Sequence, residues 1–143
     1  MVTTEKTYVD VLYVLAVKLS AEVKNTCEKD DNLILTFNNT YRSLLGNIQQ
    51  IYKLHNEIIL PQFEDCISGR CTDNMWSVLD KNAKVIEVLY KAYYLSYADS
   101  QTKLDDICRS NPLLHEAMLK TQVHIGNLYP TTQLNCPNQR LLR

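Results

Sequence analysis

Residues 75–97 carry a row of apolar side chains at a spacing that restricts how the chain can fold. The steps along the row alternate between three and four residues, which places its members on one face of an α-helix. A seven-residue recurrence of this kind is typical of a helix packed against nearly parallel neighbours. The pattern therefore predicts a long helix inside a helical bundle. The row consists of Trp76, Leu79, Ala83, Ile86, Tyr90, Tyr93 and Tyr97.

The rest of the chain is poor in the residues that interrupt helices. Only 3 glycines and 4 prolines occur among 143 residues, so long stretches contain no helix breaker. Hydrophobic residues make up 45% of the sequence, which is enough for one core in a chain of single-domain length. We therefore expect one all-α domain over residues 1–143, folded as an elongated antiparallel helical bundle.

Two long helices are predicted before this row. In residues 3–24 apolar side chains recur at steps of three and four, and Thr3 or Thr4 stands where an N-cap is needed. Residues 34–65 show the same periodicity but include Pro61, whose ring clashes with the carbonyl four residues earlier. We therefore expect a kink or a local restart of the second helix at this proline.

The predicted breaks between helices are polar. Residues 25–32 separate the first two helices, and residues 67–74 contain Gly69 and end in the capping residues Asp73 and Asn74. The helix of the apolar row is expected to end near Tyr97, where a polar stretch begins.

A fourth helix is predicted over residues 112–123. Pro112 occupies its first position, which suits a residue without an N–H, and Asn111 precedes it as the cap. Gly46, inside the second helix, is a weak interruption that favours a bend there.

Charge and hydropathy exclude several classes of partner. Lys and Arg number 15 and Asp and Glu 16, so the net charge of −1 offers no field for nucleic acid or anionic lipid. No run approaches 18 apolar residues, and no signal peptide is visible at the N-terminus. We expect a cytoplasmic protein that does not insert into a membrane.

Residues that carry chemistry are few and scattered. The 5 cysteines and 3 histidines lack the spacing of a zinc site, so we expect free thiols and neither metal nor cofactor. No phosphate-binding loop, dinucleotide-binding loop or hydrolase motif occurs, which argues against covalent or acid–base catalysis. His55 lies on an apolar helix face and is expected in the core. The other predicted core residues are Tyr8, Leu12, Tyr52, Leu89, Tyr90 and Tyr93.

Three motifs follow one another along the chain. They are TEKTYVDVL at 4–12, LGNIQQIYKLH at 45–55 and PNQRLLR at 137–143. In order and spacing they resemble the signatures of Dbl-homology (DH) domains, the RhoGEF family. The resemblance implies an all-helical module that exchanges guanine nucleotides on Rho-family small GTPases by stabilising their nucleotide-free form, without covalent chemistry.

The resemblance also implies which residues would contact the GTPase. Glu5 matches the glutamate of the family's first helix, which engages the GTPase's switch I. Gln139 and Arg143 match two residues of the fifth helix that face the GTPase. We expect all three side chains to be exposed, so that their loss would spare folding. The alternatives are a first-turn glutamate favoured by the helix dipole and a solvated helix end.

Departures from the family pattern leave other functions open. Cys136 stands where the family has a lysine, and the sequence stops at Arg143, where the family's fifth helix continues. We therefore expect a partial DH domain, cut short at its C-terminus, with a pleckstrin-homology domain next to it in the full-length parent and recruitment to the plasma membrane or cell cortex. The alternatives are a DH-like scaffold without exchange activity and an unrelated helical interaction bundle. The sequence does not indicate which Rho-family GTPase is bound.

Overall fold

The computed structural model describes residues 1–141, apart from the side chain of Ser43, and it is helical almost throughout. As predicted, the described residues contain no strand. The elements are α1 (Val2–Tyr13), the π-helix η1 (Val14–Lys18), α2 (Leu19–Thr26), α3 (Asp31–Lys53), the π-helix η2 (Leu54–Ile59), α4 (Leu60–Ile67), α5 (Met75–Ser110), α6 (Pro112–Gln122), the 3₁₀ turn η3 (Val123–Ile125), α7 (Pro130–Gln133) and α8 (Cys136–Leu141).

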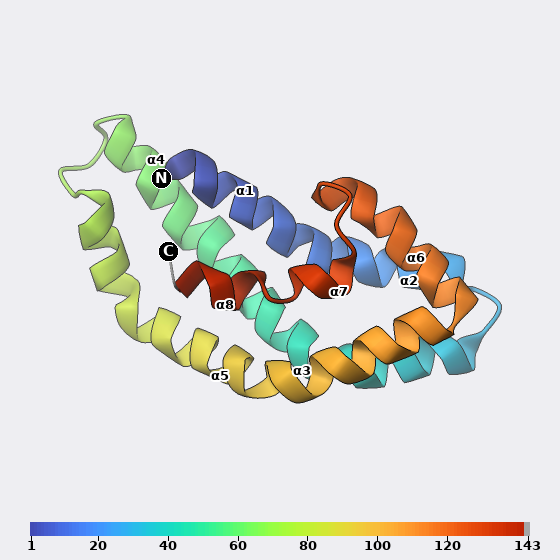
Figure 1. Cartoon of the computed structure of the whole chain (residues 1–143). Coiled ribbons are helices and arrows are strands. Elements are labelled where there is room, and N and C mark those ends of the chain that lie inside the picture. Colours follow the sequence, from blue (N-terminus) through green and yellow to red (C-terminus); the bar gives the residue numbers. More distant parts are fainter. Residues whose placement is uncertain (142–143) are drawn as a thin grey trace.

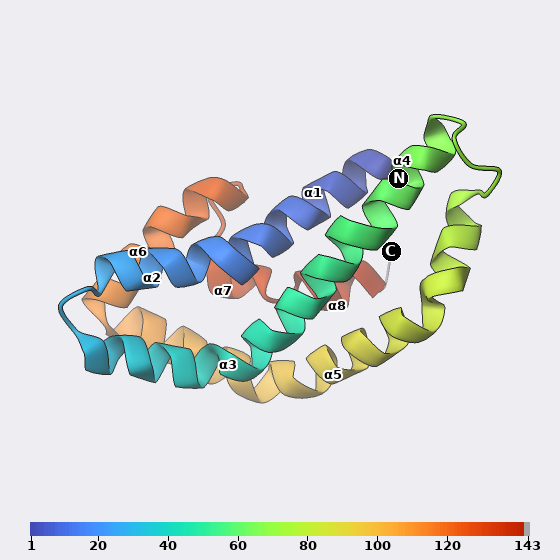
Figure 2. The same cartoon turned by 180° about the vertical axis from the view of Figure 1, so that it is seen from behind.

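The long helices run antiparallel to one another in an elongated bundle (Figure 1). The first rod is α1–η1–α2, the second is α3–η2–α4, and the bowed helix α5 runs back along the second (Figures 1 and 2). α6 returns beside α2, and the short helices α7 and α8 cross one face of the bundle. The expected fold class, an elongated antiparallel all-α bundle, is confirmed. No helix among residues 1–141 is both long enough and apolar enough to cross a membrane.

One main core runs between the rods, and a smaller one lies under α4. Five of the predicted core residues, including His55, are buried, while Tyr52 and Leu89 are half-buried against the main core. The smaller core joins Leu54, Ile59 and Phe63 to Val78 at the start of α5. The buried predicted residues are Tyr8, Leu12, His55, Tyr90 and Tyr93.

Both long rods contain a π-helical turn, each with an identifiable cause. The second precedes Pro61, and α4 begins at Leu60 with the proline in its first turn, within a rod that stays helical from Asp31 to Ile67. A wider turn relieves the clash between the proline ring and the carbonyl four residues earlier. In the first rod the buried Tyr41 hydroxyl donates a 2.9 Å hydrogen bond to the Leu15 carbonyl, which interrupts the α-helical ladder. α3 continues through Gly46 as one helix.

α5 does not end near Tyr97, as the sequence pattern predicted, but continues to Ser110. The polar stretch after Tyr97 faces solvent, and Lys103 pairs with Asp99 one turn earlier at 2.9 Å. Beyond it the buried face resumes with Leu104 and Cys108, neither of which is exposed. The polar stretch is therefore an exposed part of α5 and not its end, because the residues that follow it in the sequence return to the core.

Trp76 corrects the interpretation of the apolar row. Its side chain is 71% exposed, whereas Val78 is buried and Tyr93 is fully enclosed. A seven-residue repeat drifts by roughly 20° per heptad against the 3.6-residue helix. Trp76 lies three heptads before Tyr97, so the drift has turned it away from the core by roughly 60°.

Helix caps agree with the sequence pattern at two of three positions. The Asn74 side chain accepts a 2.9 Å hydrogen bond from the Ser77 amide, as expected of an N-cap. Asn111 precedes Pro112 at the start of α6, but its side chain donates back to the Ile107 carbonyl. The expected threonine cap of α1 is wrong, because that helix already begins at Val2 with Met1 as its N-cap.

Candidate functional site

Glu5 is the most enclosed acidic side chain in the part of the chain that the structure describes. It lies in the first turn of α1, and only 1% of it is exposed. Its Oε1 lies 2.5 Å from Nδ1 of His55 in η2, and its Oε2 accepts a 2.5 Å hydrogen bond from Arg140 in α8. The expected exposure of Glu5 is therefore wrong. The chain's first and last helices meet at this carboxylate, and the second rod closes over it.

The buried polar chain continues past His55 into the core. Nε2 of His55 lies 2.7 Å from the Tyr90 hydroxyl, which lies 2.8 Å from the Tyr8 hydroxyl. An ionised Glu5 can only accept, so the Nδ1 hydrogen of His55 is directed at it and each remaining group finds a partner in turn. Such a fully partnered network avoids the penalty of an unsatisfied polar group in the core. We call Glu5, His55, Tyr90, Tyr8 and Arg140 the Glu5 network.

The Glu5 network favours the ionised carboxylate. Burial by itself raises the pKa of Glu5, but hydrogen bonding and charge interactions with His55, followed by those with Arg140, bring the pKa below its usual value of 4.5. Burial also raises the pKa of the Tyr8 and Tyr90 hydroxyls, so both stay protonated and available to donate. The Glu5 carboxylate is therefore ionised near neutral pH, and His55 and Arg140 contact its two oxygens.

Arg140 is the outermost member of the network. Its side chain is 25% exposed, compared with 2% for that of Glu5 and 5% for that of His55. Its guanidinium carbon also lies 5.2 Å from the centre of the Tyr8 ring, a favourable cation–π position. Arg140 is therefore the partner of Glu5 that can turn towards solvent most easily, because its side chain is already partly exposed.

The other two residues expected at the site lie in or near α8. Gln139 is exposed, as expected, and precedes Arg140 in the same helix. Arg143 lies outside the described residues. The structure thus brings Arg140, the neighbour of Gln139 in α8, against Glu5 in the first turn of α1.

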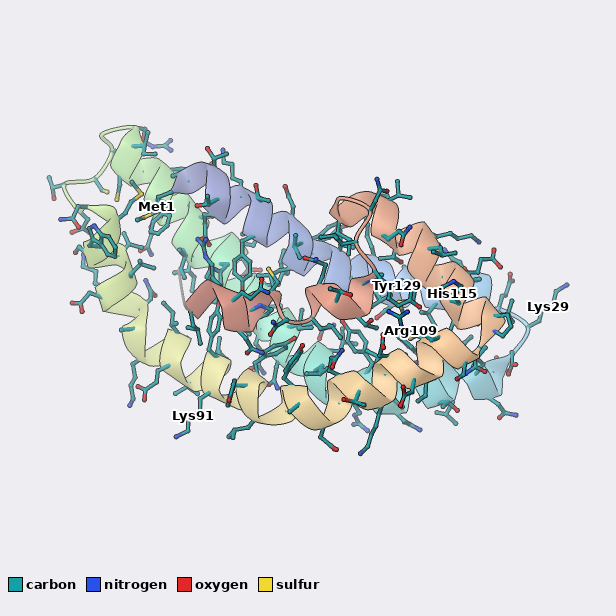
Figure 3. The ribbon with its side chains drawn as sticks, in the orientation of Figure 1. Met1, Lys29, Lys91, Arg109, His115 and Tyr129 are labelled. Atoms are coloured by element: carbon teal, nitrogen blue, oxygen red, sulfur yellow. The ribbon has the colours of Figure 1, made fainter. Side chains whose placement is uncertain are left out.

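A second polar cluster fixes the segment that leads to α8. The Arg109 guanidinium lies 4.8 Å from the centre of the Tyr129 ring and pairs with Asp105 at 3.0 Å. The Tyr129 hydroxyl lies 3.2 Å from Nδ1 of His115, and the Thr131 hydroxyl donates to Asp105 at 2.6 Å. Figure 3 shows Arg109, His115 and Tyr129 gathered where α5, α6 and the loop before α7 meet. We interpret this cluster as a structural anchor.

Between this anchor and Arg140 the chain is held by burial and one short hydrogen bond. Pro130, Leu134 and Pro137 are all buried, and the Tyr93 hydroxyl donates to the Leu134 carbonyl at 2.5 Å. These contacts explain how α8 keeps Arg140 against Glu5.

Sequence reasoning identified Glu5 and His55 but missed the contact between them and the part played by Arg140. The three residues come from three distant segments, and nothing in local spacing joins them. One signal was present, since Arg140 belongs to the same PNQR motif as Gln139. No group of three or more His, Cys, Asp or Glu residues within 1–141 is arranged to hold a metal ion.

The comparisons with known proteins agree with the fold. A family model described as the RhoGEF domain matches residues 1–143, the entire chain. Neither a curated protein nor a solved structure matches this sequence. A match over the full length, on an all-α bundle with α1 and α8 in contact, identifies the family. The chain belongs to the RhoGEF, or Dbl-homology, family.

Proposed function

We propose that this protein is a guanine-nucleotide exchange factor for Rho-family small GTPases, and that it acts by stabilising the nucleotide-free GTPase. The observation that carries the proposal is the family match over the whole chain. The activity needs no covalent step. A partner that binds the nucleotide-free form more tightly than the loaded form must, by linkage, weaken nucleotide binding by the same factor.

The proposed contact surface is the part of the bundle where Arg140 of α8 meets Glu5 of α1. Glu5 would supply a negative charge to the GTPase's switch I, and Gln139 and Arg143 would supply polar contacts beside it. The Glu5 network suits this role because its carboxylate is ionised and fixed in place. A charged side chain that is already held in one orientation loses little conformational entropy when a partner binds.

Binding through Glu5 requires an exchange of partners. The Glu5 carboxylate is covered, so the GTPase would have to displace Arg140 from Oε2 while His55 keeps its hold on Oε1. A lost ion pair is then replaced by new hydrogen bonds from the switch. The partial exposure of Arg140 makes this the least costly way to uncover the carboxylate.

A second candidate function rests on the same carboxylate. Both oxygens of Glu5 are already engaged and its side chain is 2% exposed, which favours a purely structural role and a DH-like scaffold without exchange activity. A scaffold would hold a partner without preferring the nucleotide-free state. The two candidates therefore differ in whether nucleotide release accelerates.

Nucleotide release from Rho, Rac and Cdc-type GTPases, followed with a fluorescent guanine nucleotide, tests the proposal. We expect the protein to accelerate release from at least one of them, and Gln139→Ala to slow it without loss of helicity. Lys91→Ala is the matched control, because Lys91 is exposed on α5, away from α8 (Figure 3). Unchanged release by Gln139→Ala would remove Gln139 from the contact surface, and no acceleration on any of the three would favour the scaffold.

Three wider features belong to the same proposal. The protein would act in the cytoplasm, with recruitment to the plasma membrane or cell cortex where Rho-family GTPases signal to the cytoskeleton. It would act together with a pleckstrin-homology domain. These expectations come from the family, and locating the tagged protein in cells tests the first two of them.

A further inference from the structure

The turn between α4 and α5 places two cysteine side chains against each other. Cys66 lies in the last turn of α4 and Cys71 in the following loop, with their Sγ atoms 3.3 Å apart. The sequence between them explains the approach. Gly69 adopts a left-handed conformation with φ of 71°, and the Arg70 amide donates a 3.0 Å hydrogen bond to the Asp65 carbonyl. This helix-ending motif reverses the chain and returns Cys71 to the side of Cys66.

This pair differs from the cysteines of the main core. Cys66 and Cys71 are both partly exposed, whereas Cys27 and Cys108 are sealed by the core, with 1% and 0% exposure. Neither Cys66 nor Cys71 forms a disulfide in the structure. A dissolved reagent can therefore reach the turn without unfolding the bundle, which it cannot do for the two core thiols.

We propose that Cys66 and Cys71 form a reversible dithiol–disulfide site that reacts with low-molecular-weight disulfides such as glutathione disulfide. A disulfide bond is about 2.05 Å long. The two sulfur atoms therefore need to approach by little more than about 1 Å, a movement that a surface turn can supply. This inference rests on the turn alone and does not depend on the proposed exchange activity.

The reaction is a two-step thiol–disulfide exchange. The Cys71 thiolate attacks one sulfur of glutathione disulfide, which forms a Cys71–glutathione mixed disulfide and releases one glutathione thiolate. The Cys66 thiolate then attacks the Cys71 sulfur, which forms the Cys66–Cys71 bond and releases the second glutathione. Two electrons pass from the protein to the reagent. The two thiol protons end on the two glutathione molecules.

The order of attack follows from the surroundings of the two thiols. Partial burial, then the hydrogen bond with Cys71, raise the pKa of Cys66, so little of it is thiolate near neutral pH. Cys66 is thus the better resolving group, because its attack is intramolecular and proximity offsets its low thiolate fraction. The reaction therefore depends mainly on the proximity of the two thiols. We expect the disulfide to form faster as the pH rises, because the thiolate fraction increases.

Closure would fasten the end of α4 to the loop that starts α5. A 2.5 Å ion pair between Lys81 and Asp73 already ties that loop to α5. Figure 2 shows the turn at the end of the bundle where α1 begins. A disulfide would therefore stiffen this end of the molecule and leave the buried core unchanged.

Mass spectrometry after incubation with glutathione disulfide tests the site in the intact chain. Free thiols are blocked by alkylation before digestion, so that each cysteine's state is preserved. We expect the unmodified protein to lose two hydrogen atoms within the peptide that contains both cysteines, with no lasting glutathione adduct there. In Cys66→Ser, Cys71 should instead keep a glutathione adduct that is resolved roughly tenfold more slowly, because the intramolecular resolving thiol is gone.

Cys136→Ser is the matched control and should close the turn at the unmodified rate. Far-ultraviolet circular dichroism checks that each variant keeps its helices. A lasting glutathione adduct on Cys66 or Cys71 in the unmodified protein would overturn the proposal. So would a pair that stays reduced while Cys136 reacts, or a disulfide that links two chains in place of the turn.

Discussion

Replacing Glu5 with glutamine should destabilise the folded bundle, although Glu5 is also a residue that we propose contacts the GTPase. The substitution keeps the shape of the side chain and removes its charge, so His55 and Arg140 lose their anionic acceptor. Removing one partner of a buried ion pair typically costs about 3–5 kcal/mol. The Arg140 side chain is 25% exposed and can turn to solvent, so we expect the lower end, about 3 kcal/mol.

Equilibrium urea unfolding, followed by far-ultraviolet circular dichroism, measures this loss. A loss of about 3 kcal/mol would lower the midpoint of thermal unfolding by roughly 10 °C in a domain of this size. Asp10→Asn is the matched control, because Asp10 lies exposed on the same helix and its neutralisation should change stability by about 0.5 kcal/mol or less. A Glu5→Gln loss below about 1 kcal/mol would refute the energetic role assigned to the Glu5 network.

Three further outcomes follow from the same structure. Because the pKa of Glu5 is lowered in the folded state, its contribution is fully present above pH 4.5 and is lost as the pH falls below that value, so Glu5→Gln should flatten the acid limb of a stability–pH profile. Leu104→Ala should cost about 2–5 kcal/mol in urea unfolding, since Leu104 is fully buried, and a neutral result would contradict the extension of α5. Trp76→Ala should cost about 0.5 kcal/mol or less by the same assay, because Trp76 is 71% exposed.

The sequence pattern predicts the helices well because each one's apolar period is a local property. Pro61 illustrates a local rule that held, since the ring of a proline inside a helix must be accommodated within one turn. The end of α5 illustrates one that failed. A polar stretch after Tyr97 cannot be distinguished from a loop until the packing of Leu104 on the other side is known.

The candidate site was less predictable because it depends on contacts between distant segments. The motif at residues 4–12 identifies Glu5 as a residue of interest, but spacing on one helix cannot indicate what another helix places over it. Arg140 is 135 positions away in the sequence, and only the path of α7 and α8 brings it to the carboxylate. Burial of Glu5 is therefore a tertiary property, and the expectation of exposure failed for that reason.

The measurement that tests the proposed function most directly is the affinity of the protein for one GTPase in two states. Binding to nucleotide-free and to GDP-loaded Rho-family GTPases can be compared on the same immobilised protein. We predict tighter binding of the nucleotide-free form, by the same factor by which the protein weakens nucleotide binding. Equal affinity for the two states, or no binding to any nucleotide-free member, would contradict an exchange factor.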